Sequence, residues 1–309
     1  MICVVQAAGA CDLVQDLGRP GYAHLGVPQG GAADPGALIQ ANRLVGNALQ
    51  AAGLELTLSG PLLAFPEGGI VALTGADMGA VRDSGLAAPR YQTLWLHPGE
   101  VLRLGAVRDG CRGYVGLAGG IATAPVLQSR ATFVAGGFGG LAGRALRSGD
   151  RLPLGPPPFP PPSARLPAAR FGRSAVLRVV PGPQGAAFDD RALLQFYGAM
   201  FRVSSASNRT GIRLDGPHLT APAAGEGPSQ ALLPGAVQVP PDSRPIVLGW
   251  DGPVTGGYPV IAGVISADLP GLAQLAPGSG VAFRGVSLEE ARQAWRARLA
   301  EWEVALEWL

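Results

Sequence analysis

The sequence predicts a mainly β fold divided into two domains. Glycine (47 residues) and proline (29 residues) together make up about a quarter of the 309 positions, which indicates many turns and few long helices. Hydrophobic residues form 47% of the chain and charged residues 15%, a composition typical of globular domains with a large core. A proline-rich stretch interrupts the chain near its middle. We therefore expect short strands joined by tight turns on each side of that stretch.

The proline-rich stretch is the best candidate for a domain boundary. Positions 156–162 hold six prolines and Phe159, which favours a stiff polyproline II-like segment over a folded element. We expect an N-terminal β domain over 1–155, a linker over 156–174, and a C-terminal β domain with a terminal helix over 175–309. A ligand for an SH3-type domain is the alternative interpretation of the prolines. A turn followed by a short strand recurs at 96–105, 146–155 and 275–285, which suggests two related domains.

The first elements surround a long, turn-rich loop. A strand over 2–5 and a second strand ending near Leu17 are followed by the turns 18–21 and 28–31. Asp34 is a good helix N-cap and Pro35 suits the first helical position, so a helix is expected from there to about Leu44. The loop either joins a strand to a helix or is held rigid to present polar side chains to a ligand, namely Asp16, Arg19, His24 and Asp34.

The remaining elements of the first half are predicted from alternation and turn signals. A half-buried strand is expected over 54–58, with Glu55 facing either solvent or the same cleft as Arg19. Residues 74–77 are interpreted as a turn between two strands. The other expected strands of this half are 70–73, 80–82, 94–96, 101–104 and 114–117.

Besides the short strand within 275–285, the second half is predicted to hold five strands and two helices. The strands are expected at 175–180, 201–204, 235–241, 245–250 and 261–265, with a helix over 188–196. Ser287 and Glu290 form a capping box that begins the longest helix, expected to reach about Leu309. Its apolar stripe, which includes Trp295 and Trp302, either packs on the parent domain or contacts a partner protein.

The charged residues exclude several functions. All 24 basic residues are arginine and the formal net charge is +2. Without lysine the chain has no Walker A lysine, no Schiff-base lysine and no site for biotinylation, so it cannot itself carry biotin. An anion would have to be bound by arginine, backbone N–H groups or helix N-termini. The small net charge gives no argument for nucleic-acid or membrane binding.

Cysteine and histidine point to a cytoplasmic protein without a metal centre. Cys3, Cys11 and Cys111 are odd in number and show no CxxC spacing, which fits free thiols in a reducing compartment. The three histidines are far apart, so we predict no metal site. No signal peptide is predicted, and no apolar run reaches the roughly 18 residues of a membrane span.

Two segments of the second half carry candidate binding and catalytic groups. Arg209 and Arg213 flank a turn at Asn208 and Gly211, where they are either exposed arginines or a two-arginine clamp for a carboxylate or phosphate. Asp251, Thr255 and Tyr258 bring polar chemistry to a second glycine-containing turn. A loose dinucleotide-type spacing at 137–142 lacks the strand–turn–helix setting and is rejected.

Motifs along nearly the whole chain resemble one family. In the first half they are 15–21 (QDLGRPG), 26–28 (GVP), 31–32 (GA), 34–35 (DP), 41–42 (AN) and 46–47 (GN). In the second half they are 207–209 (SNR), 213–214 (RL), 216–217 (GP), 238–241 (QVPP), 245–248 (PIVL), 255–259 (TGGYP) and 266–269 (SADL). This pattern is similar to the carboxyltransferase-like family that includes the C subunit of 5-oxoprolinase, allophanate hydrolase subunit 2 and the C-terminal part of urea carboxylase.

The resemblance implies a fold, a reaction and partners. It implies two cyclophilin-like β-barrel domains and a cytoplasmic component of a complex that acts with a companion B subunit. With a third component, the A subunit, such a system opens 5-oxoproline to L-glutamate using ATP. It implies two catalytic residues, Asp251 and Tyr258, and six substrate-binding residues, Arg19, Asp34, Asn208, Arg209, Arg213 and Thr255.

Two alternatives to the 5-oxoprolinase interpretation remain. One is a carboxyltransferase-like component for urea, allophanate or another small amide, with biotin on a different chain. The other is a regulatory component that binds without catalysis. The chain departs from the family pattern at six positions, Thr210, Ile212, Gln230, Pro253, Val254 and Val260.

Overall fold

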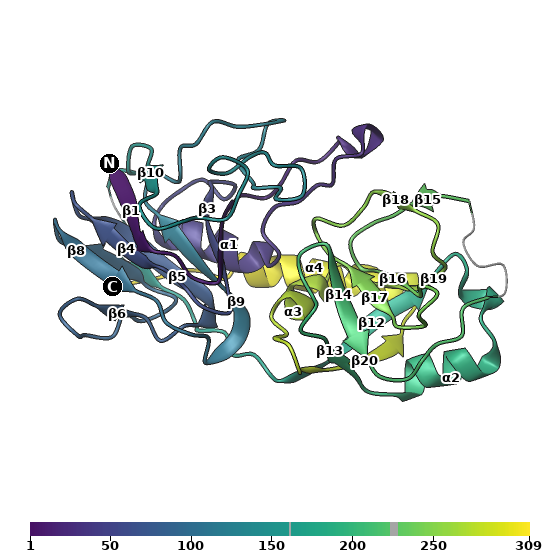
Figure 1. Ribbon diagram of the computed structural model, residues 1–309. Helices are drawn as coiled ribbons and strands as arrows, with labels where there is room; N and C mark the ends of the chain where they lie inside the picture. Colours follow the sequence, from purple (N-terminus) through teal and green to yellow (C-terminus); the bar gives the residue numbers. More distant parts are fainter. Residues whose placement is uncertain (161, 223–227) are drawn as a thin grey trace. The chain divides into compact units, whose positions relative to one another are not determined.

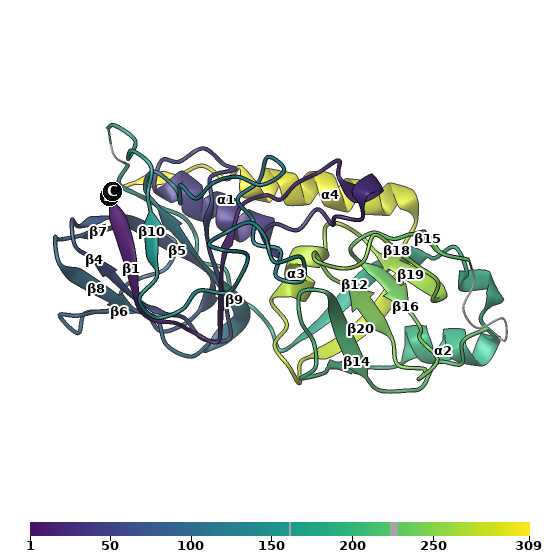
Figure 2. The same cartoon turned by 45° about the horizontal axis from the view of Figure 1, so that its top comes forward.

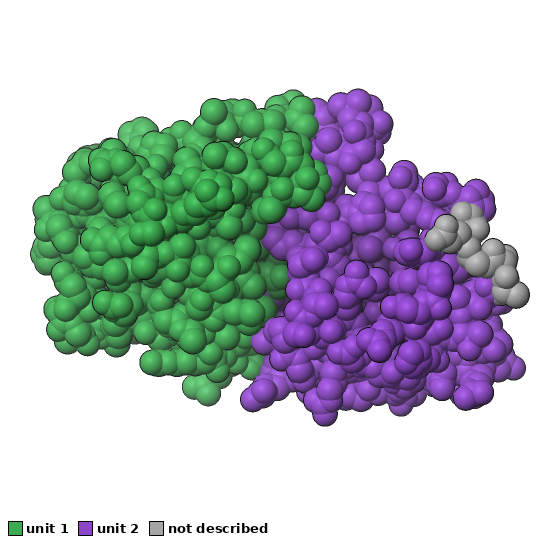
Figure 3. All heavy atoms as spheres, in the orientation of Figure 1, with its two compact units in different colours: residues 1–19, 30–171, 302–309 green, residues 20–29, 172–301 purple. Residues whose placement is uncertain are grey.

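The structure, a computed structural model, describes residues 1–160, 162–222 and 228–309. Pro161 of the predicted linker therefore lies outside the described residues. The chain forms two compact units, each built from segments that are separated in sequence (Figure 3). Unit 1 contains Met1–Arg19, Gly30–Phe171 and Trp302–Leu309. Unit 2 contains Pro20–Gln29 and Gly172–Glu301.

Unit 1 is built from two five-stranded antiparallel sheets (Figure 1). The first has the order β10 (Arg151–Pro153), β1 (Ile2–Ala7), β4 (Leu62–Phe65), β8 (Glu100–Arg103) and β6 (Val81–Arg82). The second has the order β2 (Cys11–Gln15), β3 (Gly53–Thr57), β9 (Asp109–Leu117), β5 (Gly69–Asp77) and β7 (Thr93–Leu96). Buried side chains of both sheets share one core, including Val5 and Leu63 from the first and Leu54 and Val115 from the second.

Helix α1 (Pro35–Leu44) begins as predicted and lies along the second sheet (Figure 2). The Asp34 carboxylate accepts a hydrogen bond of 3.1 Å from the Ala37 N–H, as an N-cap should. The Thr74 hydroxyl of β5 donates to the Ala37 carbonyl at 2.7 Å, which fixes the helix on the sheet. Residues 74–77 are part of β5, so the predicted turn there is wrong. Pairing with β9 keeps this segment in the strand, with a shift of register between Gly75 and Asp77.

The C-terminal helix α4 (Leu288–Trp302) is shorter than predicted. Its capping box is present, because Ser287 Oγ accepts from the Glu290 N–H at 3.2 Å and the Glu290 carboxylate accepts from the Ser287 N–H at 2.7 Å. No residue of α4 is buried, so its apolar stripe is only partly covered.

Long-range contacts end α4 at Trp302. The Arg43 guanidinium donates to the Trp302 carbonyl at 2.8 Å, and Leu306 packs in a cluster with Leu44. The chain then forms β21 (Glu307–Trp308), which pairs antiparallel with β11 (Ala164–Arg165) from the predicted linker. The prediction of helix up to Leu309 is therefore wrong.

Unit 2 contains a closed barrel of seven strands (Figures 1 and 2). In order around the barrel these are β12 (Ser174–Pro181), β19 (Val260–Val264), β16 (Ala236–Gln238), β17 (Ile246–Leu248), β14 (Gly211–Asp215), β13 (Phe201–Val203) and β20 (Gly280–Gly285). The parallel pair β12–β20 closes the barrel. Leu177, Val237, Val247 and Phe283 belong to the barrel core.

Short elements complete unit 2. Helix α2 (Asp190–Gly198) is capped by Asp189 and places Phe196 in a stack on Phe283, with ring centroids 4.4 Å apart. A two-stranded sheet pairs β15 (Gln230–Ala231) with β18 (Thr255–Gly256). The remaining pieces are α3 (Leu269–Ala273) and the 3-10 turns η1 (Ala23–Leu25) and η2 (Gly185–Ala187). The prediction of a mainly β chain with few helices is confirmed; of the two β-barrel domains expected, unit 2 contains a closed barrel and unit 1 contains the two five-stranded sheets.

Candidate functional site

Arg19 of unit 1 is held in place by a loop that Asp16 organises. The Asp16 carboxylate accepts hydrogen bonds from the Gly18 N–H (2.8 Å), the Ser129 hydroxyl (2.7 Å) and the Arg130 N–H (2.6 Å). Arg19 itself is 1% exposed. Its guanidinium donates to the Ala131 carbonyl and lies 5.1 Å from the centre of the Phe138 ring. Hydrogen bonding together with a cation–π contact makes this a fixed rather than a mobile arginine.

The loops that carry Arg19 and Asp34 are joined to each other. The Ala32 N–H donates to the Asp16 carbonyl at 2.8 Å. Gly31 has φ of +83°, and a Cβ there would lie 2.6 Å from the Gly18 nitrogen, so only glycine allows this approach. The loop therefore holds Asp16, Arg19 and Asp34 rigidly, and the presentation of these side chains to a ligand stays a prediction. His24 lies in η1, which belongs to unit 2.

Glu55 and Tyr114 accept hydrogen bonds from the loop that carries Asp34, and neither was predicted as a site residue. The Glu55 carboxylate, 0% exposed, accepts from the Ala33 N–H at 2.7 Å and from the Tyr114 hydroxyl at 2.8 Å. The Tyr114 oxygen in turn accepts from the Asp34 N–H at 2.8 Å. Burial, followed by the nearby Glu55 carboxylate, raises the pKa of Tyr114 well above its usual value, which keeps the hydroxyl available as a donor.

Glu55 therefore corrects the prediction of a half-buried strand over 54–58, because the glutamate faces neither solvent nor an open cleft. Arg112 lies 3.7 Å from the same carboxylate. A glutamate between two leucines in a strand is the signal that could have identified this network, since a buried carboxylate requires partners.

A glycine-rich loop lines a shallow pocket of about 580 Å³ beside Arg19. Residues 137–143 form one wall, and Thr123 and Val126 lie on another. A Cβ added to Gly139 would lie 3.0 Å from the Arg19 guanidinium, so the backbone of this wall touches the arginine directly. The Arg130 guanidinium donates to the Thr123 carbonyl at 2.8 Å.

Arg209 and Asp251 of unit 2 form a buried ion pair with two parallel hydrogen bonds. Arg209 Nε donates to one Asp251 oxygen at 2.8 Å and a terminal nitrogen donates to the other at 2.9 Å. The two residues are 8% and 7% exposed. The Asp251 N–H also donates to the Arg209 carbonyl at 3.1 Å, so backbone and side chains join the two turns. Such a pair has a defined geometry that lysine could not reproduce.

The residues around this pair have different orientations. Asn208 Oδ1 accepts from the N–H groups of Thr210 (2.8 Å) and Gly211 (3.2 Å), which fixes the turn that carries Arg209. Arg213 is exposed on β14, between the buried Ile212 and Leu214. The structure thus brings together Asn208, Arg209 and Asp251, whereas Arg213 faces outward from the barrel.

Thr255 and Tyr258 lie on the segment that follows Asp251. Thr255 is exposed in β18, where it pairs with Ala231. Tyr258 is half-buried, and its carbonyl accepts from the Gln238 amide at 3.4 Å. The hydrogen bonds thus link Asp251 with Arg209, and the main chain of Tyr258 with Gln238. Across the described ranges, no group of three or more His, Cys, Asp and Glu side chains could hold a metal ion.

The helices of the described residues include none that is long and apolar enough to cross a membrane.

Comparison with known proteins establishes the family. Residues 25–285 match the family model for the carboxyltransferase domain, subdomain A and B. The 5-oxoprolinase C subunit of Escherichia coli (strain K12) is 41% identical over 292 residues, covering 93% of this chain and 92% of that protein. The 5-oxoprolinase C subunit of Haemophilus influenzae is 34% identical, covering 92% of this chain and 91% of that protein. The chain therefore belongs to the carboxyltransferase-domain family.

A solved structure agrees with this assignment. The Kluyveromyces lactis urea carboxylase matches with a TM-score of 0.90 and 31% identity over 98% of this chain. The match covers only 29% of the longer urea carboxylase chain. This chain thus corresponds to one part of that enzyme and to most of the two bacterial proteins.

Proposed function

We propose that this chain is the C subunit of an ATP-dependent 5-oxoprolinase, which opens the lactam of 5-oxoproline to L-glutamate together with the A and B subunits. The observation that carries the proposal is the similarity to the Escherichia coli 5-oxoprolinase C subunit, which extends over 93% of this chain and 92% of that protein. The name of that relative supports a place in a multi-subunit complex. We propose that the activity belongs to the assembled complex and that the complex is cytoplasmic.

ATP is proposed to be used by the complex. This chain has no lysine, so it cannot form a P-loop phosphate site of the usual kind. We therefore assign no ATP contact to a residue here. The lactam is an unreactive amide, and coupling to ATP hydrolysis is one way past that barrier.

The site residues are proposed to act in two clusters. Arg19 and Asp34 of unit 1 are proposed to bind substrate. In unit 2 we propose Asn208, Arg209, Arg213 and Thr255 for substrate binding, and Asp251 and Tyr258 for proton transfer. The bidentate contact with Asp251 supports a modified role for Arg209, in which it orients Asp251, while the exposed Arg213 meets the substrate carboxylate or a phosphorylated intermediate.

The function is tested by purifying this chain with its companion subunits and measuring glutamate formation and 5-oxoproline-dependent ADP release. We expect product only when all three subunits are present. A stable complex without turnover would contradict the proposal and favour a regulatory role or another amide substrate.

The roles of the arginines are tested in the same assay. Arg213→Ala is expected to lower kcat/KM by more than about tenfold, because a charge-assisted hydrogen bond to the substrate is lost. Arg202→Ala is the matched control, since Arg202 is also an exposed barrel arginine, on the neighbouring strand β13. Equal activity of the two variants would remove Arg213 from the site.

A carboxyltransferase-like component for urea or allophanate is the second candidate, favoured by the TM-score of 0.90 to the Kluyveromyces lactis urea carboxylase. It would need a biotin carrier on a different chain. Carboxylation of free amide in the presence of such a carrier, without 5-oxoproline turnover, would support this candidate.

A further inference from the structure

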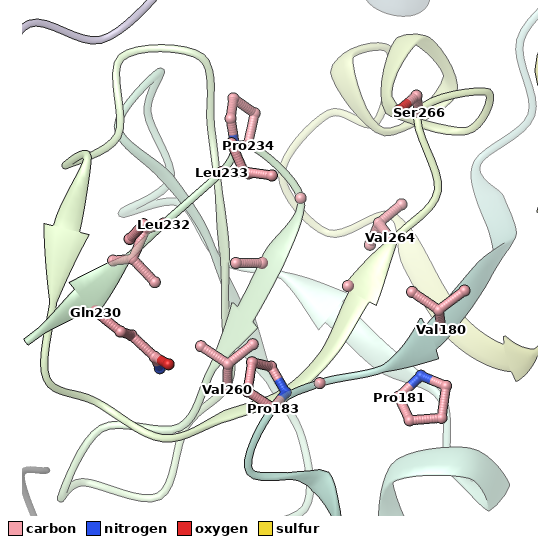
Figure 4. A pocket seen from close by; sticks show the side chains of 15 residues that line it. Val180, Pro181, Pro183, Gln230, Leu232, Leu233, Pro234, Val260, Val264 and Ser266 are labelled. Atoms are coloured by element: carbon pink, nitrogen blue, oxygen red, sulfur yellow. The ribbon is translucent and has the colours of Figure 1, made fainter. Parts of the chain in front are cut away.

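A second pocket, on the outer face of the barrel in unit 2, has a volume of about 310 Å³ (Figure 4). Three neighbouring strands form its floor. Gly263 of β19 pairs with Val180 of β12 and with Ala236 of β16, so the floor carries only short side chains. A Cβ added to Gly263 would have its nearest neighbour 3.8 Å away, so the floor has unfilled space above this glycine.

The walls of this pocket are apolar and uncharged. They include Pro183 from the turn after β12, and Leu232 and Leu233 from the segment after β15. None of the described residues that line it is acidic, basic or histidine. The pocket therefore suits a small neutral group and offers no side-chain charge to a carboxylate or phosphate.

Gln230 provides the polar recognition group at the edge of this pocket. Figure 4 shows its side chain reaching from β15 toward Val260 and Pro183. Its carboxamide forms two reciprocal hydrogen bonds of 3.0 Å with the carboxamide of Gln184. The Gln184 oxygen also accepts from the Val260 N–H at 3.1 Å, which fixes which end of each amide is the donor.

Reciprocal bonding of this kind is what a cis-amide offers. A lactam places its N–H and C=O on the same edge of the ring, so it can accept from the Gln230 nitrogen and donate to the Gln230 oxygen as Gln184 does. The exchange replaces the two Gln184–Gln230 hydrogen bonds with two to the lactam while the apolar ring enters the pocket. Gln184 retains its contact with the backbone of Val260 after such an exchange.

We propose that this pocket binds the neutral cis-amide edge of a lactam ring through the carboxamide of Gln230. The choice of ligand class rests on the proposed function. The location is consistent with it, because β15 pairs with β18, so Gln230 lies opposite Gly256 in the segment that carries Thr255 and Tyr258. A carboxylate on the ring would remain outside the pocket.

The test uses 2-pyrrolidinone as the probe and N-methyl-2-pyrrolidinone as its matched partner without the N–H donor. Both are titrated into the full chain by saturation-transfer NMR. We expect 2-pyrrolidinone to bind about tenfold more tightly, because the methylated ring loses one hydrogen bond and clashes with the Gln230 oxygen. Equal binding of the two probes would overturn the proposal.

Two variants examine the pocket by different routes. Gln230→Leu removes the amide, and Gly263→Val fills the floor at a strand position whose φ is not positive. Each is expected to weaken 2-pyrrolidinone binding about tenfold, whereas Gln293→Leu, at an exposed glutamine of α4, leaves it unchanged. Thermal unfolding checks that the variants are folded, and unchanged binding by folded Gly263→Val would overturn the proposal.

The pocket proposal and the proposed function can be rejected independently of each other. Probe binding that depends on Gln230, without 5-oxoproline turnover in the assembled complex, would support the pocket and reject the oxoprolinase. Turnover with an unchanged KM in a complex that carries Gln230→Leu would support the oxoprolinase and reject the pocket.

Discussion

Arg209 and Asp251 show what a single buried contact contributes at the scale of residues. Each side chain is more than nine-tenths buried, and each satisfies the other through two hydrogen bonds. Removing one side chain deprives the buried charge of the other of this bidentate contact, which costs more than the intact pair contributes.

We therefore predict that Arg209→Ala and Asp251→Ala each lower the free energy of unfolding by about 3–5 kcal/mol. The double variant should lose much less stability than the sum of the two single losses, because it removes both charges together. Urea denaturation of the four proteins measures the coupling, and additive losses would contradict a direct interaction.

Asp12 is a second buried carboxyl group, and it predicts a pH dependence. Burial raises its pKa from 3.8 to about 6, and a hydrogen bond from the Gly9 N–H acts in the opposite direction. The folded state thus binds this proton more tightly than the unfolded state. The contribution of Asp12 to stability is fully present below pH 3.8 and is lost as the pH rises through about 6.

Asp12→Asn should remove this loss, since an amide does not ionise. Relative to the wild type, the variant is expected to gain stability by about 2–3 kcal/mol between pH 4 and pH 7. Urea denaturation at several pH values measures the difference. A constant difference across this range would mean that Asp12 is ionised equally in both states.

At the scale of elements, α1 shows how a tertiary contact overrides local preference. Gly36 lies in the first turn of α1, where alanine is usually better by about 0.5–1 kcal/mol. A Cβ at this position, however, would overlap the indole ring of Trp302 and would lie 2.7 Å from its Cδ1 atom. The glycine is therefore needed for packing rather than for the helix.

Gly36→Ala is predicted to destabilise unit 1 by about 1–3 kcal/mol through overpacking. Gly198→Ala, at the end of α2, is the matched control, because a Cβ there meets no atom within 4 Å. Thermal unfolding compares the two variants. A Gly36→Ala protein as stable as the control would show that Trp302 moves aside without cost.

Elements that rest on local signals could be predicted from the sequence. The start of α1 at Asp34 and Pro35 and the capping box of α4 depend on residues within one helical turn. The end of α4 could not be predicted, because the group that contacts the Trp302 carbonyl is Arg43, 259 positions away in sequence.

The same limit applies to the candidate site. Motifs single out Arg209 and Asp251, but they do not indicate that each is the other's partner across 42 positions. The alternation around Glu55 predicts a half-buried strand, and the sequence does not show which residues pair with this glutamate, because Ala33 and Tyr114 lie 22 and 59 positions away. The assigned chemical roles of the site residues stay predictions.

At the scale of the whole molecule, the chain returns to unit 1 after unit 2 is complete. Residues 302–309 add the strand β21, the side chain of Leu306 and the Arg43 contact to unit 1. The predicted division into domains at 1–155 and 175–309 stays a prediction, and removal of this segment tests it.

Deleting residues 302–309 is expected to lower the stability of unit 1 by about 2–4 kcal/mol, as apolar burial and hydrogen bonds are lost together. Hydrogen exchange should accelerate in α1 and in residues 164–166, while the barrel strands of unit 2 keep their protection. Exchange that accelerates in the barrel instead would place the terminal segment with the C-terminal domain.

The pairing of β11 with β21 also has a consequence for solubility. Strand β7 ends its sheet, and the β11 segment lies beside it, because the Ala164 N–H donates to the Thr93 hydroxyl and Gln92 forms a bridge with Arg165. Exposed sheet edges are templates for pairing between molecules, whereas the closed barrel of unit 2 presents none. Loss of the terminal strand would therefore uncover the edge of β11, and the shortened protein should aggregate through unit 1.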